Sequence, residues 1–224
     1  MAQEKIDSNL VYQPNQSTVS SEDAIPFAVL GLFLLIGYFI LRKAFGMANW
    51  ELKVQMKPGN VLQLASITRQ FTSVAILILM EQGKLSLHDP LSKYILDFPG
   101  GNEIPLQHLL NHTSGLRDYS RIPELRDKTR LDMIPEEIIS TFKNLPLEFN
   151  ANEKYDYSNS GYLLLGYIIE KSSGMSYGDF VQKNIFAKPG MKNSYCNNSY
   201  KIIPNRANGY HFFEGTPDHY RRRD

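Results

Sequence analysis

Residues 66–82 have the clearest helical pattern in this chain. The apolar residues of this stretch recur at the spacing of an α-helix and occupy more than one of its faces. They include Ile67, Phe71, Val74, Ala75, Ile78 and Leu79. Gly83 follows where the helix is expected to end. Because a helix with so little polar surface is rarely found at the protein surface, we expect it to be central and buried.

Further helices are predicted after this one, and they outnumber the strands. Their ranges are 91–94, 106–110, 135–143, 160–174 and 176–186. Short extended pieces are expected between Phe45 and Leu64, interrupted by Pro58-Gly59. The pattern therefore indicates a mixed domain that contains more helix than strand.

The composition excludes several classes of function. With 224 residues, 42% of them hydrophobic, the chain has enough apolar material for one domain with a real core. The net charge is +1, and the only basic cluster is Arg221–Arg223, which gives no footprint for nucleic acid. A single cysteine, Cys196, excludes an internal disulfide. No metal or cofactor is implied, since ligand-spaced clusters, phosphate loops and dinucleotide fingerprints are missing from the sequence.

The beginning of the chain differs from the rest. Residues 1–23 are polar and predict a flexible leader, whereas residues 24–41 carry no charge and are followed by Arg42-Lys43. Together, the uncharged run 24–41 and the basic pair make up an apolar segment, 24–43, that is just long enough for a membrane helix with a basic stop. A β-hairpin with its turn near Gly37 is the alternative, because periodicity cannot separate the two over so short a run. Residues 44–224 form the remaining domain.

Ser66 lies where the long helix begins, and two interpretations fit it. A serine at a helix start is usually an N-cap. However, a hydroxyl near the positive end of a helix dipole also suits a nucleophile. A lysine three residues later would share its face and could take its proton. That position holds Arg69, whose guanidinium stays charged and cannot act as the base.

Several sequence blocks resemble one known superfamily in order and spacing. They are LASITRQFTS, IPLQHLLNHTSGL, YDYSNSGYLLLG and GMKNS. From about Phe45 to Tyr210 the chain resembles serine β-lactamases and penicillin-binding proteins, with the class C β-lactamase-like branch as the closest match. The resemblance implies an α+β fold in which a helical region is packed on an antiparallel sheet. It also favours the hairpin for residues 24–43, although apolar residues flank Gly37 where a turn would favour polar ones.

The same resemblance implies roles for individual residues. Ser66 is the expected acylated nucleophile, and Arg69 occupies the position of the family's lysine. Tyr157 matches the tyrosine that helps to move the serine proton, and Asn159 matches the asparagine that orients the substrate's carbonyl side. Taken alone, Tyr157 and Asn159 would fit an ordinary turn before a helix. His112 belongs to a block that looks structural in the family.

Two departures from the family pattern suggest weakened activity. Arg69 removes the direct proton acceptor, and no candidate for the family's third motif, Lys or His followed by a small residue and Gly, precedes Asp224. That motif lies on a core strand, so the resemblance implies a C-terminally truncated chain whose sheet is incomplete.

Three functional hypotheses remain. The first is a serine hydrolase that forms an acyl-enzyme on Ser66 with a β-lactam, a D-Ala-D-Ala peptide or a small ester. The second is a catalytically silent binding or sensor module, tethered to a membrane through residues 24–41. The third is a truncated gene product. The expected partner is a small molecule or peptide, and the expected location is a bacterial cell envelope or a single-pass membrane position.

Overall fold

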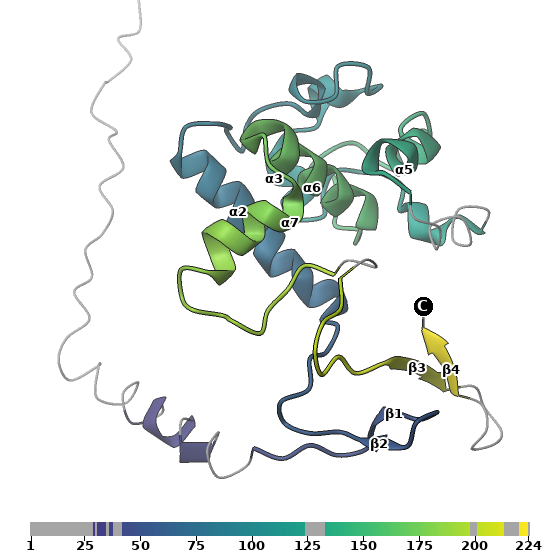
Figure 1. Cartoon of the computed structure of the whole chain (residues 1–224). Helices are drawn as coiled ribbons and strands as arrows, with labels where there is room; N and C mark the ends of the chain where they lie inside the picture. The colour runs from purple at the N-terminus through teal and green to yellow at the C-terminus, as the bar shows by residue number, and fades with distance from the viewer. Residues whose placement is uncertain are drawn as a thin grey trace, which may run out of the picture.

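The computed structural model describes residues 29, 31–34, 36–37, 42–123, 133–197, 201–212 and 220–223. The helices labelled α2 to α7 gather in one body, apart from the helical residues near the N-terminus, and the strands lie together near the end at which the long helix α2 begins (Figure 1). The α-helices are α2 (Thr68–Glu81), α3 (Leu106–Leu110), α5 (Pro135–Phe142), α6 (Asn159–Ser173) and α7 (Tyr177–Val181). Short 3-10 turns are η1 (Ala65–Ile67), η2 (Leu91–Lys93), η3 (Gly101–Glu103) and η4 (Tyr119–Arg121), and η6 (Gln182–Phe186) is a π-helical turn.

The predicted helices are confirmed to within one or two residues. The long helix opens with the 3-10 turn η1 before α2 continues to Glu81, so the helical stretch starts at Ala65. The last predicted helix is divided, because α7 passes directly into the π-helical turn η6. Apolar residues at helical spacing located these elements, whereas the change of helix type needed the packing around them.

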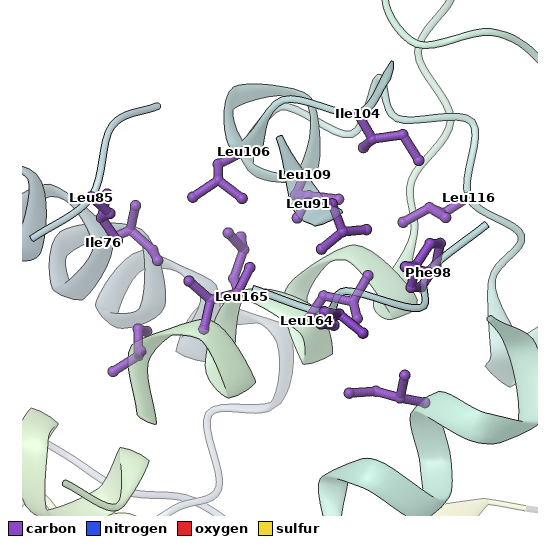
Figure 2. Close-up of a cluster of buried hydrophobic side chains, with 14 of the residues drawn as sticks. Ile76, Leu85, Leu91, Phe98, Ile104, Leu106, Leu109, Leu116, Leu164 and Leu165 are labelled. Atoms are coloured by element: carbon purple, nitrogen blue, oxygen red, sulfur yellow. The ribbon is translucent and has the colours of Figure 1, made fainter. Parts of the chain in front are cut away.

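The hydrophobic core lies between α2, α3 and α6 and the loops around η2 and η3. Ile76 and Leu79 of α2 are fully buried, as are Leu164 and Leu165 of α6. Leu109 of α3, also fully buried, lies in the same cluster (Figure 2). This core fixes α2 against α6; the turn η1, which leads into α2, carries the serine expected at the site, and α6 begins with the expected asparagine.

Helix α2 was expected to be central and buried, and in the structure it is buried on one face only. Its buried residues are Thr72, Ala75, Ile76 and Leu79, which lie on the side that faces the other helices. In contrast, Val74 and Leu77 remain 42% and 41% exposed. Helices α6 and α7 contact one side of α2, and apolar composition alone does not show which faces find a neighbour.

The β-structure consists of two short antiparallel pairs in the described residues. Strand β1 (Met47–Asn49) pairs with β2 (Val54–Gln55), and β3 (Gly209–Phe212) pairs with β4 (Tyr220–Arg223). The two pairs are adjacent, because the Asn208 N–H donates to the Ala48 carbonyl at 2.9 Å. Helices packed beside a small antiparallel sheet confirm the α+β fold class, and the sheet is partly incomplete, as predicted.

The N-terminal expectations are covered only in part. The leader 1–23 lies outside the described residues, as do residues 24–28, 30, 35 and 38–41 of the apolar segment. Residues 29, 31–34 and 36–37 are helical, so the extended backbone that the hairpin needs is not found there. Leu, Phe and Ile are compatible with both conformations, which is why the sequence did not decide. No helix in the described part of the chain combines the length and the apolar character needed to cross a membrane.

Gly115 provides a test of the packing between the NHTSG loop and the irregular segment that ends at Phe149. Its φ is +74°, and a Cβ added to it would lie 1.9 Å from the Phe149 carbonyl oxygen. Gly115→Ala is therefore expected to lower the free energy of unfolding by about 3 kcal/mol or more, since both the backbone and the contact resist the change. Urea denaturation followed by circular dichroism measures this loss.

Gly83→Ala is the matched control for this prediction. Gly83 has a similar φ of +68°, but an added Cβ would meet nothing within 4 Å. Only the backbone penalty of about 1 kcal/mol is expected there. Equal losses in the two variants would show that the close approach of Gly115 to Phe149 has no energetic weight.

Candidate active site

Ser66 lies at the centre of the 3-10 turn η1, at the start of the long helix. The residues that cap η1 and α2 are Leu64 and Ile67, and neither helix has a side-chain cap. The N-cap interpretation of Ser66 is therefore wrong. Ser66 is exposed, and its Oγ accepts a hydrogen bond from the Tyr157 hydroxyl at 2.9 Å. Two residues 91 positions apart in the sequence thus share one hydrogen bond.

The backbone around Tyr157 is held on both sides. The Arg121 guanidinium donates to the Tyr157 carbonyl at 2.9 Å, and the next N–H, that of Ser158, donates to His112 Nδ1 at 3.2 Å. Ser158 is the N-cap of α6, with its side chain accepting from the Gly161 N–H. These contacts place the Tyr157 ring beside the start of α2.

Arg69 packs its guanidinium on aromatic rings in the site. The Arg69 Cζ lies 4.5 Å from the ring centroid of Tyr157 and 5.2 Å from that of Tyr162. The same guanidinium donates to Asn159 Oδ1. A cation over the face of an aromatic ring is attracted to it and favours negative charge that develops on the ring oxygen. Arg69 thus supplies positive charge to Tyr157 although it cannot accept a proton.

His112 forms the other wall of this aromatic cluster. Its ring centroid lies 4.6 Å from that of Tyr157 and 5.0 Å from that of Tyr162, and it is also in edge contact with Tyr155. Since Nδ1 accepts the Ser158 N–H, a neutral ring carries its proton on Nε2. Burial lowers the pKa of His112 from 6.5, and the Arg69 charge lowers it further. His112, which the sequence analysis assigned to a structural block, therefore packs directly against Tyr157, the expected base.

The buried, neutral His112 leads to a prediction about pH and stability. Arg69 opposes protonation of the ring, whereas Asp118 and Asp156 favour it, and the resulting pKa is lowered. The unfolded chain then binds the proton more readily than the folded one. The free energy of unfolding is therefore expected to decrease as the pH falls below about 6.5 and through the lowered folded value.

Urea denaturation at a series of pH values between 7.5 and 5 measures this dependence. His112→Asn is expected to make it shallower, because asparagine keeps an acceptor and tolerates the left-handed φ of +61° at this position. His108→Asn is the comparison, since burial lowers the pKa of His108 as well. An unchanged slope in His112→Asn would contradict the assignment of a neutral buried ring.

Both the nitrogen and the oxygen of the Asn159 side-chain amide form hydrogen bonds. Its Nδ2 donates to Asp118 Oδ2 at 2.8 Å and to Ser120 Oγ at 2.8 Å, while its Oδ1 accepts from Arg69. Asp118 is buried and accepts from both the N–H and the hydroxyl of Ser120. The site thus contains Ser66, Arg69, Tyr157 and Asn159 together, and it extends to two residues that the sequence did not single out.

An ion pair between Arg121 and Asp156 lies at the edge of the site. Both guanidinium ends of Arg121 donate to the Asp156 carboxylate, at 3.0 and 2.9 Å. This contact holds the pKa of Asp156 below its usual value. Because Asp156 precedes Tyr157, the pair helps to fix the segment that presents the tyrosine.

A cavity of about 690 Å³ lies next to the 3-10 turn η1 that contains Ser66. Ala65, Thr68 and Phe71 line it together with Tyr177 and Cys196, but the four site residues do not. The Ser66–Tyr157 pair is therefore presented at the surface beside this cavity rather than inside it. Among the described residues, no three His, Cys, Asp or Glu side chains are grouped to hold a metal ion.

The beta-lactamase family model matches residues 37–220, which is most of the chain. The chain belongs to the beta-lactamase family. Within that family it is 35% identical over 176 residues to Penicillin-binding protein 4* of Bacillus subtilis, covering 78% of this chain and 39% of the relative. It spans 48% of the length of Putative penicillin-binding protein PbpX from the same organism, with 31% identity and 88% of this chain covered. The chain thus spans less than half the length of these relatives.

Solved structures of family relatives have the same fold. The penicillin-binding protein from Bacillus halodurans aligns with a TM-score of 0.70 at 28% identity, covering 80% of this chain and 56% of that one. The D-amino acid amidase from Ochrobactrum anthropi SV3 in complex with D-phenylalanine aligns with a TM-score of 0.68 at 28% identity, covering 78% and 51%. The expected superfamily of serine β-lactamases and penicillin-binding proteins is therefore confirmed, and the class C branch is not distinguished from its neighbours.

Sequence reasoning missed the residues that support the site from outside. Asp118, Ser120 and Arg121 follow the NHTSG block within one short loop, and the proximity of that block was the only signal. His112 lies inside the block, but nothing in its sequence context indicated contact with Tyr157. These contacts join segments about 40 residues apart, which sequence spacing cannot pair.

Proposed function

We propose that this protein is a serine hydrolase that forms an acyl-enzyme on Ser66. The observation that carries the proposal is the 2.9 Å hydrogen bond between the Ser66 and Tyr157 hydroxyls, with the Arg69 guanidinium over the Tyr157 ring. A serine activated by a neighbouring group that is itself oriented is the general arrangement for nucleophilic catalysis. Here His112 and Arg69 hold that neighbouring group from two sides.

The proposed chemistry uses these residues as follows. Ser66 Oγ forms a bond to the substrate's carbonyl carbon, and its proton passes to the Tyr157 oxygen as the tyrosine's own hydroxyl proton moves to the leaving nitrogen or oxygen. The bond from the carbonyl carbon to that protonated leaving atom breaks, and Tyr157 is left as the hydroxyl with which it began. Arg69 stabilises negative charge on the Tyr157 oxygen during the transfer. Water, deprotonated through Tyr157, subsequently hydrolyses the ester on Ser66.

The relatives support a class of substrate. One is named for acting on D-amino acid amides and others for binding penicillin, so both act on or bind compounds that contain an amide carbonyl. We therefore place β-lactams, D-Ala-D-Ala-type peptides and small esters as the candidate substrates. The bacterial penicillin-binding relatives likewise support a location in the cell envelope.

Arg69 favours a second candidate function, a binding module that does not turn over. Its guanidinium is committed to Asn159 and to two aromatic rings, and it cannot relay a proton from Ser66. If the protein is a serine hydrolase, arginine in place of the family's lysine weakens acylation, because Tyr157 then has no lysine to share the proton transfer. Under the second, the site binds the ligand and Ser66 stays unmodified.

Intact-mass spectrometry of the purified chain separates the two functions. The chain is incubated with a penicillin or with an alkyl fluorophosphonate, and any adduct is mapped by digestion to its serine. Ser73 is an internal comparison, because its hydroxyl also lies close to a tyrosine hydroxyl, that of Tyr162, at 3.1 Å. An adduct on Ser66 and not on Ser73 supports the hydrolase. A chain that melts cooperatively and binds penicillin without an adduct supports the binding module.

A further inference from the structure

The side-chain amide of Asn159 has no donor left for a substrate. An asparagine amide has two N–H donors and one carbonyl oxygen. In Asn159 the two donors are directed at Asp118 and Ser120, and the oxygen accepts from Arg69. For Asn159 to donate to a substrate's carbonyl group, as its family position implies, one of these hydrogen bonds would first have to break.

The chemistry of the neighbours fixes the orientation of this amide. A guanidinium only donates hydrogen bonds, so the group that faces Arg69 must be the amide oxygen. An ionised carboxylate only accepts, so the group that faces Asp118 must be the amide nitrogen. A flipped amide would place a donor against Arg69 and an oxygen against Asp118, and both contacts would be repulsive. Asp118 and Arg69 thus specify one orientation from opposite ends.

Asp118 is itself held rigidly enough to act as the fixed end of this chain of contacts. Its side chain is 3% exposed, and Oδ1 accepts from the Ser120 N–H and hydroxyl, both at 2.9 Å. The adjoining backbone is tied to α6, because Ser160 Oγ donates to the Arg117 carbonyl and accepts from the Tyr119 N–H. Oδ2 therefore has little freedom to move away from Asn159.

We propose that Asp118 is a positioning residue which, through the Asn159 amide, holds the Arg69 guanidinium against the Tyr157 ring. In this role the Asn159 amide does not donate to the substrate. Its nitrogen is fixed by Asp118, and its oxygen in turn fixes the Arg69 guanidinium. The proposal rests on the proposed function of the same site. It assigns a role to a buried carboxylate that touches none of the reacting groups, and it explains how an arginine can stand where the family has lysine and still supply its charge.

Two covalent probes test this proposal because they differ in what Asn159 could donate to. A penicillin carries an amide side chain, whereas an alkyl fluorophosphonate carries none. With the latter, Ser66 Oγ bonds to phosphorus, fluoride leaves, and the serine proton passes through Tyr157 to solvent. If Asn159 acts through Arg69, Asp118→Asn and Asn159→Ala each slow labelling by both probes by the same factor, about tenfold or more.

A selective effect would overturn the proposal. If Asn159 donates to the substrate, Asn159→Ala slows penicillin acylation and leaves fluorophosphonate labelling unchanged. Asp89→Asn is the matched control, since Asp89 also accepts several hydrogen bonds, from Ser86, Lys93 and Tyr94. Asp89→Asn removes a carboxylate from the loop between α2 and η2. The labelling rates of this variant are expected to equal those of the unaltered protein. A rate loss in Asp89→Asn equal to that in Asp118→Asn would reduce Asp118 to a structural role.

A readout that does not need a reactive serine separates this proposal from the proposed function. In nitrogen-15 NMR spectra the Arg69 guanidinium signals are expected to show hindered rotation, and Asp118→Asn is expected to relieve it. Hindered rotation in a chain that neither probe labels would refute the acyl-enzyme and retain the positioning role. Free rotation of Arg69 in the unaltered chain would refute the positioning role whatever the labelling shows.

Discussion

Ser66→Ala is expected to abolish covalent labelling of this protein by penicillins and fluorophosphonates. The variant lacks the only hydroxyl that receives the Tyr157 hydrogen bond, and no other nucleophile is placed against this tyrosine in the described residues. The substitution should fold normally, because Ser66 is exposed and caps neither η1 nor α2. Intact-mass spectrometry after prolonged incubation should show unmodified chain only, and the thermal midpoint should match that of the unaltered protein.

Ser73→Ala is the matched control for the loss of a serine on the same helix. Ser73 lies two turns further along α2 and shares a hydrogen bond with Tyr162, so its removal tests whether any serine near a tyrosine matters. Labelling in Ser73→Ala should continue at the original rate. An adduct that persists in Ser66→Ala would contradict the acyl-enzyme proposal, because the reactive atom would then lie elsewhere.

Tyr157→Phe is expected to slow labelling by a factor of about 10² to 10⁴, which is the usual contribution of a positioned acid or base. The change removes the hydroxyl that contacts Ser66 and leaves the ring between Arg69 and His112. Stability should therefore change little, while the second-order rate constant for acylation falls. Stopped incubations analysed by mass spectrometry measure that rate constant across a range of probe concentrations.

Tyr162→Phe serves as its control because the two tyrosines share neighbours. Tyr162 also lies under Arg69 and beside His112, but its hydroxyl donates to the Leu110 carbonyl and lies near Ser73. Removing that hydroxyl should lower stability and leave the labelling rate nearly unchanged. Equal rate losses in the two variants would show that the effect does not depend on the hydroxyl that contacts Ser66, and would contradict the proton-transfer role of Tyr157.

The sequence by itself predicted the helices and the four residues that lie together at the candidate site. Apolar residues at a spacing of three and four located α2 and α6, because a helix must bury one face to be stable in water. The glycine after each helix marked its end within two residues. The blocks around Ser66 and Tyr157 indicated the family, and the fold and the contact between the two hydroxyls followed that expectation.

The tertiary structure alone decided which residues support that pair. Asp118 reaches Arg69 only through Asn159, and His112 reaches the Tyr157 ring only because α6 begins beside the NHTSG loop. Such contacts depend on three-dimensional packing between distant segments, and local spacing carries no record of them. The same reason explains the exposed face of α2: a sequence shows that a side chain is apolar, but only packing shows whether a neighbour covers it.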